Sequence, residues 1–157
     1  MQLKLLTLTL PLAALPAAAF AAPAAQPIEL SGEVRIVAVE LVDGQPREVL
    51  RAPKVVVPGD RLVFHTAYRN AGGAPVRDFV VTNPVPAGVT VSGEGPALEL
   101  VSIDGGKSWN RLAALSVTAA DGSRRPAMPG DITHLRWSMR EIPPGGEGRL
   151  TYHAIVR

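Results

Sequence analysis

The sequence predicts an all-β fold, an antiparallel β-sandwich that forms a single domain behind an N-terminal targeting segment. Short apolar or alternating runs follow one another along the chain, and glycine, proline or aspartate bounds nearly every run. The runs recur at intervals of about 8 to 12 residues, as in sandwiches. The one stretch that competes for a helix, residues 109–120, contains Ser116, Val117 and Thr118, which favour extended backbone.

The first 21 residues have the composition of a secretory signal peptide. Lys4 precedes an apolar run over residues 5–20, and the run ends in a small-x-small pattern at Ala21. Two prolines interrupt this run, which is shorter than the ~20 residues of a membrane-spanning helix. We therefore expect cleavage after Ala21, with Ala25 as the next candidate, and export to the periplasm or the extracellular medium.

The rest of the chain is predicted to be a flexible N-terminal segment, residues 22–32, followed by the sandwich domain, residues 33–157. The chain contains no cysteine, so disulfides and lipid attachment to cysteine are both excluded. With 16 basic and 14 acidic residues it is nearly neutral, which argues against binding to nucleic acid or to an anionic membrane. No membrane span is expected after cleavage.

Nine segments have the composition and bounding residues of strands. They are residues 34–42, 49–57, 61–70, 78–82, 89–92, 98–103, 112–118, 132–139 and 149–156. Segment 49–57 is the expected sheet edge, because Pro53 and Pro58 would interrupt a hydrogen-bonded ladder.

Alternation within three of these segments predicts which side chains face the core. The expected inward residues are Leu62, Phe64, Thr66 and Tyr68 in segment 61–70, Leu135, Trp137 and Met139 in segment 132–139, and Leu150, Tyr152, Ala154 and Val156 in segment 149–156. This arrangement places most of the few aromatic residues in the core.

The turns are predicted from dipeptides and tripeptides that favour positive φ. Asp-Gly pairs at residues 43–44, 104–105 and 121–122 are typical of tight hairpins. Pro-Gly-Asp at residues 58–60 and at residues 129–131 precedes a strand each time, and we expect a type II turn with a left-handed glycine at both places.

The run over residues 57–91 resembles the bacterial conserved-repeat domain known as domain of unknown function eleven. The order is a Pro-Gly-Asp turn, an alternating strand that ends in Asn-x-Gly, a second strand and a Thr-Asn-x-x-Pro-x-Gly turn. The matching residues are Pro58, Gly59, Asp60, Asn70, Gly72, Thr82, Asn83, Pro86 and Gly88. The resemblance extends more weakly over most of the remaining domain and implies an immunoglobulin-like β-sandwich of about seven to nine strands in an exported bacterial protein without catalysis.

Two asparagines of this pattern are interpreted as turn residues. Asn70 and Asn83 can each bond to nearby backbone groups, and Asn83 stands where many members of the resembled family have aspartate, which can make the same bond. The alternative is a polar contact with a glycan or a peptide.

The octapeptide SIDGGKSW resembles the Asp-box motif S-x-D-x-G-x-[ST]-W through Ser102, Asp104, Gly106, Ser108 and Trp109. In sialidases this motif shapes a hairpin away from the catalytic centre, and one copy does not imply sialidase activity. We interpret it as a structural turn in which Asp104 accepts amide hydrogen bonds and Trp109 packs over the hairpin. Contact with a glycan or peptide and a calcium loop are the alternatives.

No catalytic or cofactor site is predicted. His65, His134 and His153 lie on the expected solvent sides of their strands, and they could bind a metal only if those strands were neighbours. The sequence contains no nucleophile motif and selects no pair of acids. We therefore expect a non-enzymatic module without cofactor that contacts a protein or an envelope component, by its loops or by strand addition at an edge. A carbohydrate-binding module, with Trp109 as the stacking platform, is the alternative.

Overall fold

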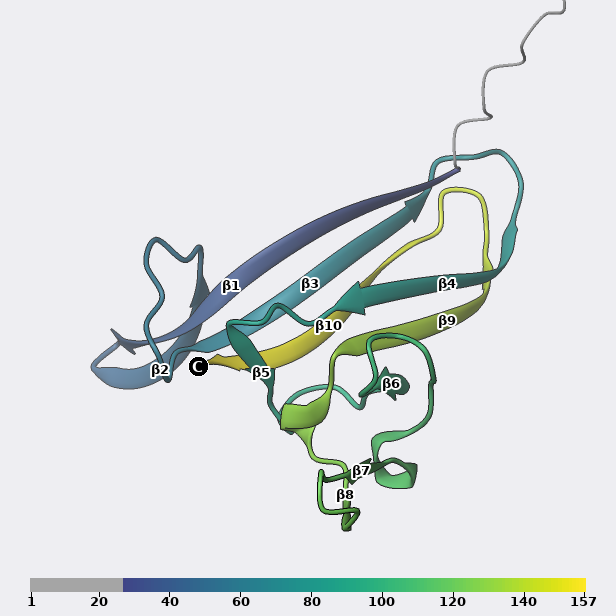
Figure 1. Cartoon of the computed structure of the whole chain (residues 1–157). Coiled ribbons are helices and arrows are strands. Elements are labelled where there is room, and N and C mark those ends of the chain that lie inside the picture. Colours follow the sequence, from purple (N-terminus) through teal and green to yellow (C-terminus); the bar gives the residue numbers. More distant parts are fainter. Residues whose placement is uncertain (1–26) are drawn as a thin grey trace, which may run out of the picture.

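A computed structural model describes residues 27–157 (Figure 1). The expected signal peptide, both cleavage positions and residues 22–26 of the expected flexible segment lie outside the described residues. Ten strands and two 3-10 helices make up the described part. The elements are β1 (Ile28–Val42), β2 (Gln45–Arg51), β3 (Arg61–Asn70), β4 (Val76–Pro84), β5 (Val89–Val91), β6 (Leu100–Ser102), η1 (Leu112–Ala114), β7 (Ser116–Thr118), β8 (Arg124–Pro126), η2 (Pro129–Asp131), β9 (His134–Ile142) and β10 (Glu147–Val156).

Every strand pairing is antiparallel. The larger sheet has the order β2-β1-β3-β10-β5, the second sheet has the order β4-β9-β6, and β7 and β8 form a separate hairpin. The protein is all-β, and its antiparallel sheets are consistent with a β-sandwich. Within residues 27–157, no helix is long and apolar enough to cross a membrane.

The core lies between the two larger sheets. Leu62 and Tyr152 of the five-stranded sheet and Val101 and Leu135 of the three-stranded sheet belong to one buried cluster. The ring of Tyr152 stacks on the ring of Phe64, with 4.6 Å between their centroids. Of the side chains expected to face inward, Leu62, Leu135, Tyr152 and Ala154 belong to this cluster, and Phe64, Trp137 and Val156 pack against it, so the core side of β3, β9 and β10 is identified correctly at these positions. Val63 is an exception, because it lies on the other face of β3, between Arg35 of β1 and His153 of β10, and is nevertheless buried.

The first strand begins earlier than expected. Residues 28–32, which the sequence analysis placed in a flexible segment, belong to β1 and pair with β3 from Ile28 opposite Asn70 onward. The domain boundary expected at residue 33 is therefore five residues too late. Ile28, Leu30 and Gly32 continue the side of β1 that carries Val34 and Ile36, and they alternate with polar residues, which is itself the pattern of a strand.

Two other strands differ from expectation. The strand expected over residues 49–57 is found at Gln45–Arg51, because the tight turn at Asp43 and Gly44 starts β2 immediately after β1. The segment expected over residues 112–118 is divided into η1 and β7, and β7 pairs with β8, which the sequence analysis did not identify. The ten strands exceed the expected seven to nine for this reason. The edge strand predicted for residues 49–57 corresponds to β2, which does lie at the edge of the larger sheet. Pro53 and Pro58, on which that prediction relied, lie beyond the end of β2.

β1 extends past β3. Its pairing with β3 ends at Ile36 opposite Leu62, whereas its pairing with β2 continues from Ile36 to Val42. We call the protruding ribbon, residues 37–51, the wing. Residues on alternate positions of the wing share one face, and the face opposite the core side carries Val37, Val39 and Leu41 from β1 and Pro46, Glu48 and Leu50 from β2. We call this set the wing face.

Candidate functional site

The octapeptide hairpin is organised around one carboxylate. Oδ1 of Asp104 accepts hydrogen bonds from the hydroxyl of Ser102 at 2.7 Å and from the amides of Lys107 and Ser108 at 3.1 and 3.0 Å. Oδ2 accepts the hydroxyl of Ser108 at 2.6 Å. These bonds, above all those from Ser108, hold the pKa of Asp104 well below its usual range. Asp104 is therefore anionic at neutral pH and already coordinated by donors of its own turn.

Ser102 anchors this hairpin to the core. Its side chain is fully buried, and its Oγ accepts the amide of Gly106 at 2.9 Å. Gly105 and Gly106 have φ values of 77° and 87°, in the left-handed region that glycine adopts at little cost. The octapeptide therefore has the geometry of a satisfied turn. The tight Asp-Gly hairpin expected at residues 104–105 is wrong, because Asp104 has no positive φ and the bridge between Val101 and Asn110 closes a longer loop that contains the whole octapeptide.

The calcium alternative conflicts with this geometry. A calcium ion requires six or more oxygen ligands, and carboxylate oxygens are preferred. Both oxygens of Asp104 accept hydrogen bonds from O–H or N–H donors, which occupy the directions that a cation would need. No group of three or more potential metal-ligating side chains occurs within the described residues.

Trp109 packs against the hairpin and against β9. Its indole N–H donates to the carbonyl of Gly106 at 3.0 Å. The guanidinium carbon of Arg136 lies 3.7 Å from the centre of the ring, and the ring of His134 approaches at 6.2 Å with an interplanar angle of 81°. Because Arg136 occupies one face of the indole, that face is not available as a platform for stacking a sugar.

Two residues of this region were not identified from the sequence. The Thr133 hydroxyl accepts the amide of Gly105 at 3.1 Å and donates to the carbonyl of Ser102 at 3.0 Å, and Arg136 covers Trp109. Both precede or belong to β9, about 30 residues away from the octapeptide in sequence. Only the pairing register of β6 and β9 brings them together, and no local motif signals that register.

Asn70 joins two loops at the opposite end of the sandwich. It is completely buried, and the two hydrogens of its amide nitrogen are shared among the carbonyls of Ala74, Ile142 and Pro143, at 2.9, 3.0 and 3.2 Å. Its amide oxygen accepts the backbone N–H of Gly72 at 2.9 Å. With every polar atom of its side chain occupied by the protein's own backbone, Asn70 has the contacts of a structural corner.

The remaining residues of the family-like pattern are not all in turns. Asn83 lies within β4, and its amide donates to the hydroxyl of Thr66 at 2.8 Å, which links β4 to β3 across the sandwich. The interpretation of Asn83 as a turn residue bonded to nearby backbone is therefore wrong, because the strand continues through it and its partner belongs to the other sheet. Thr82 lies exposed on β4, and the Pro86 carbonyl accepts the amide of Val89 at 3.1 Å around Gly88.

The two Pro-Gly-Asp turns use the same aspartate contact with different backbones. Asp60 Oδ2 accepts the amide of Val57 and Asp131 Oδ2 accepts the amide of Met128, both at 2.8 Å. Gly59, between Pro58 and Asp60, has a φ of 95°, as a type II turn requires. Gly130 lies in the 3-10 helix η2 and has no positive φ, so the expected second type II turn is wrong.

The three histidines do not come together. His65 and His153 lie on neighbouring strands of the larger sheet, whereas His134 lies on β9 in the second sheet. His65 shares a hydrogen bond of 2.9 Å with the hydroxyl of Thr151, and burial, aided by the positive charge of Arg149, lowers its pKa. The three histidines are therefore not arranged to bind one metal ion together.

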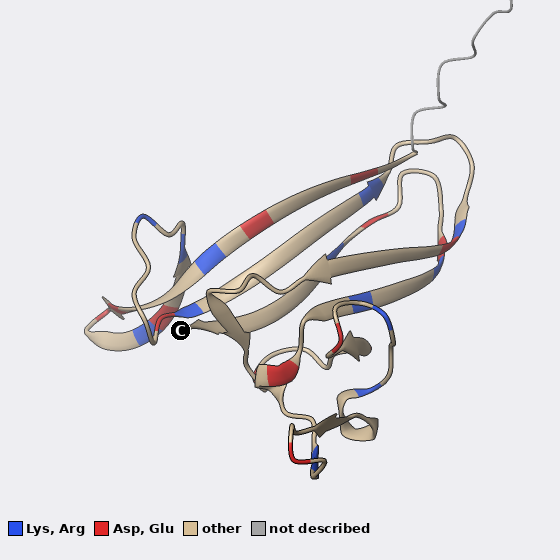
Figure 2. Cartoon of the chain, in the orientation of Figure 1, with Lys and Arg blue, Asp and Glu red and all other residues tan. Residues whose placement is uncertain are grey.

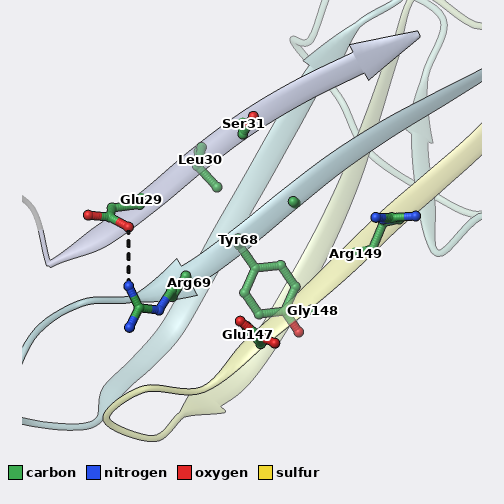
Figure 3. Close-up of a pocket in the computed structure, with 9 residues that line it drawn as sticks. Glu29, Leu30, Ser31, Tyr68, Arg69, Glu147, Gly148 and Arg149 are labelled. Carbon is green, nitrogen blue, oxygen red and sulfur yellow. Dashed lines mark ion pairs between the residues drawn. The ribbon is translucent and has the colours of Figure 1, made fainter. Parts of the chain in front are cut away.

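A groove of about 530 Å³ crosses β1, β3 and β10 (Figure 3). Glu29 and Arg69 on its wall form an ion pair at 3.9 Å, and Tyr68 lies over Gly148. The groove is open, its lining includes no histidine, and acids and bases alternate along it. It therefore offers neither an assembled catalytic pair nor a single charge for a ligand.

The wing exposes several large apolar side chains that the core does not bury. Val39 is 68% exposed, Leu41 76% and Leu50 50%, and all three lie on the wing face. The loop that follows β2 adds Val55 at 77% exposure. Apolar side chains gathered on one exposed face are typical of an interaction surface.

No family model, no curated protein and no solved structure matches this chain.

Proposed function

We propose that this chain is an exported, non-catalytic β-sandwich module that associates with another polypeptide through its wing. One observation carries the proposal, namely the exposed apolar wing face on an edge hairpin. An edge strand that presents both unpaired backbone groups and apolar side chains is suited to protein association. Export rests on the signal-like composition of residues 1–21.

We also infer an immunoglobulin-like arrangement related to the conserved-repeat domain. Support comes from the antiparallel sheets and from the positions of the family-like residues. Asp60, Asn70 and Asn83 each bond to the chain at a turn or between strands. A solved structure with the strand order of the immunoglobulin fold would support this inference, and a different connectivity of the two sheets would overturn it.

Affinity capture with matched variants tests the functional proposal. The wild type, Leu41→Asp and Val80→Asp would be incubated with an envelope fraction of the source cells. Val80 is a suitable control, since it is 48% exposed and lies on β4 in the other sheet. We expect the wild type and Val80→Asp to retain the same protein and Leu41→Asp to lose it. Equal retention by all three variants, or by none, would contradict a binding role for the wing.

A further inference from the structure

The wing lacks a second layer. β1 from Val37 onward pairs only with β2, so this part of the larger sheet is a two-stranded ribbon. A two-stranded hairpin is marginally stable in water unless a third strand or another layer covers it. The wing nevertheless carries its apolar side chains outward, and its tip is a tight turn with Asp43 at a φ of 51° and Gly44 at 77°.

The charges of the wing fit a neutral partner. Residues 37–51 contain Glu40, Asp43 and Glu48 against Arg47 and Arg51, so the two signs nearly cancel. Glu40 pairs with Arg51, and Glu48 pairs with Arg61 of β3. Figure 2 shows acidic and basic segments side by side in this region. The wing therefore neither repels a second wing nor attracts a strongly charged ligand or membrane.

The apolar area suits a weak dimer. Complete burial of one valine or leucine removes on the order of 60 to 120 Å² from water. At the exposures of Val39, Leu41 and Leu50, together with exposed Pro46 and half-buried Val37, each wing face offers roughly 200 to 300 Å² of apolar surface. Two such faces would bury roughly 400 to 600 Å² of apolar surface, which is below the ~1,200 Å² of stable specific interfaces and is typical of a weak, concentration-dependent association.

We propose that the partner of the wing is a second copy of this chain, with the two wing faces packed on each other. This inference rests on the proposed function, because it names the partner of the same surface. Face-to-face packing gives each two-stranded ribbon the second layer that it lacks, at the ~10 Å spacing of packed sheets. Leu41 and Val39 would lie inside the contact, and Glu48, directly opposite Val39, would lie beside them with its charge paired to Arg61 of the same chain.

Sedimentation velocity over a wide concentration range tests the dimer. The wild type and Val80→Asp should show the same concentration-dependent shift from monomer to dimer. Leu41→Asp should raise the dissociation constant at least tenfold, because it buries a carboxylate among apolar side chains. A wild type that stays monomeric at every concentration, or a dimer that Leu41→Asp leaves intact, would overturn the proposal.

Disulfide trapping gives a second readout that does not depend on how well the aspartate variant folds. The chain has no cysteine, so Leu41→Cys and Val80→Cys each introduce a single thiol. We expect oxidation to cross-link Leu41→Cys into covalent dimers at least tenfold faster than Val80→Cys. Equal rates would contradict the packing of two wings.

The capture experiment separates this inference from the proposed function. A monomeric wild type whose wing still retains a different envelope protein would refute only the dimer. A monomeric wild type that also retains nothing through Leu41 would refute both.

Discussion

Two hairpins of this protein contain the same Asp-Gly dipeptide, yet their backbones and their surroundings differ. Asp104-Gly105 lies in the octapeptide SIDGGKSW, where four hydrogen bonds hold the carboxylate and Trp109 lies beneath Arg136. Asp43-Gly44 forms the tip of the wing, where Leu41 is 76% exposed. The residues with positive φ are Asp43 and Gly44 at the tip of the wing but Gly105 and Gly106 in the octapeptide, so the dipeptide alone does not specify the turn. The packing of the flanking residues decides whether the hairpin serves stability or association.

Asn70→Ala should cause the largest loss of stability among these variants. The change leaves three buried or partly buried carbonyls and one amide without their side-chain partner, and we expect a loss of about 3 kcal/mol in the free energy of unfolding. Urea unfolding measures it. Asn110→Ala, at an exposed asparagine, is the control and should change the stability little. If the two variants are equally stable, Asn70 is not a structural corner.

Ser102→Ala tests the octapeptide hairpin directly. Ser102 is fully buried, and alanine removes the acceptor of the Gly106 amide and one donor to Asp104. We expect a loss of about 1 to 2 kcal/mol, measured by urea unfolding, with no effect on dimerisation. A weaker dimer at unchanged stability would reverse the roles of the two hairpins.

Acid should weaken the octapeptide hairpin and leave the wing face unaffected. The pKa of Asp104 is lowered by folding, so its contribution is complete well above 3.8, its usual value, and is lost as the pH falls toward the folded value. The stability difference between the wild type and Asp104→Asn should therefore be constant above about pH 5 and shrink below it. Thermal unfolding from pH 7 to pH 2 measures this difference. A difference that grows in acid would contradict the observed hydrogen bonds.

Leu41→Thr should have the smallest effect on the monomer. The side chain is largely exposed, so we expect a change within about 0.5 kcal/mol in unfolding at a concentration too low for association. Dimerisation of this variant should still weaken. A large loss of monomer stability would show that Leu41 packs within its own chain.

The sequence alone predicts only part of the difference between the octapeptide hairpin and the wing. Alternation placed β3 at its observed bounds and identified the inward side chains of β9 and β10, because one face of each is buried in the core. The apolar residues 55–57 suggested a longer second strand, whereas the turn at Asp43 starts β2 at Gln45 and sets its register with β1, and the pairing ends at Arg51. The contacts of Thr133 and Arg136 with the octapeptide depend on pairing between distant strands, which local sequence does not specify.

The different roles of the two hairpins can be tested most directly by amide hydrogen exchange at a low and a high protein concentration. The amides of Gly106, Lys107 and Ser108 donate to Ser102 and Asp104 of their own hairpin and should exchange at the same rate at both concentrations. Peptides that cover residues 37–51 should become more protected at the high concentration. Concentration-dependent protection of the octapeptide, with none in the wing, would contradict the account.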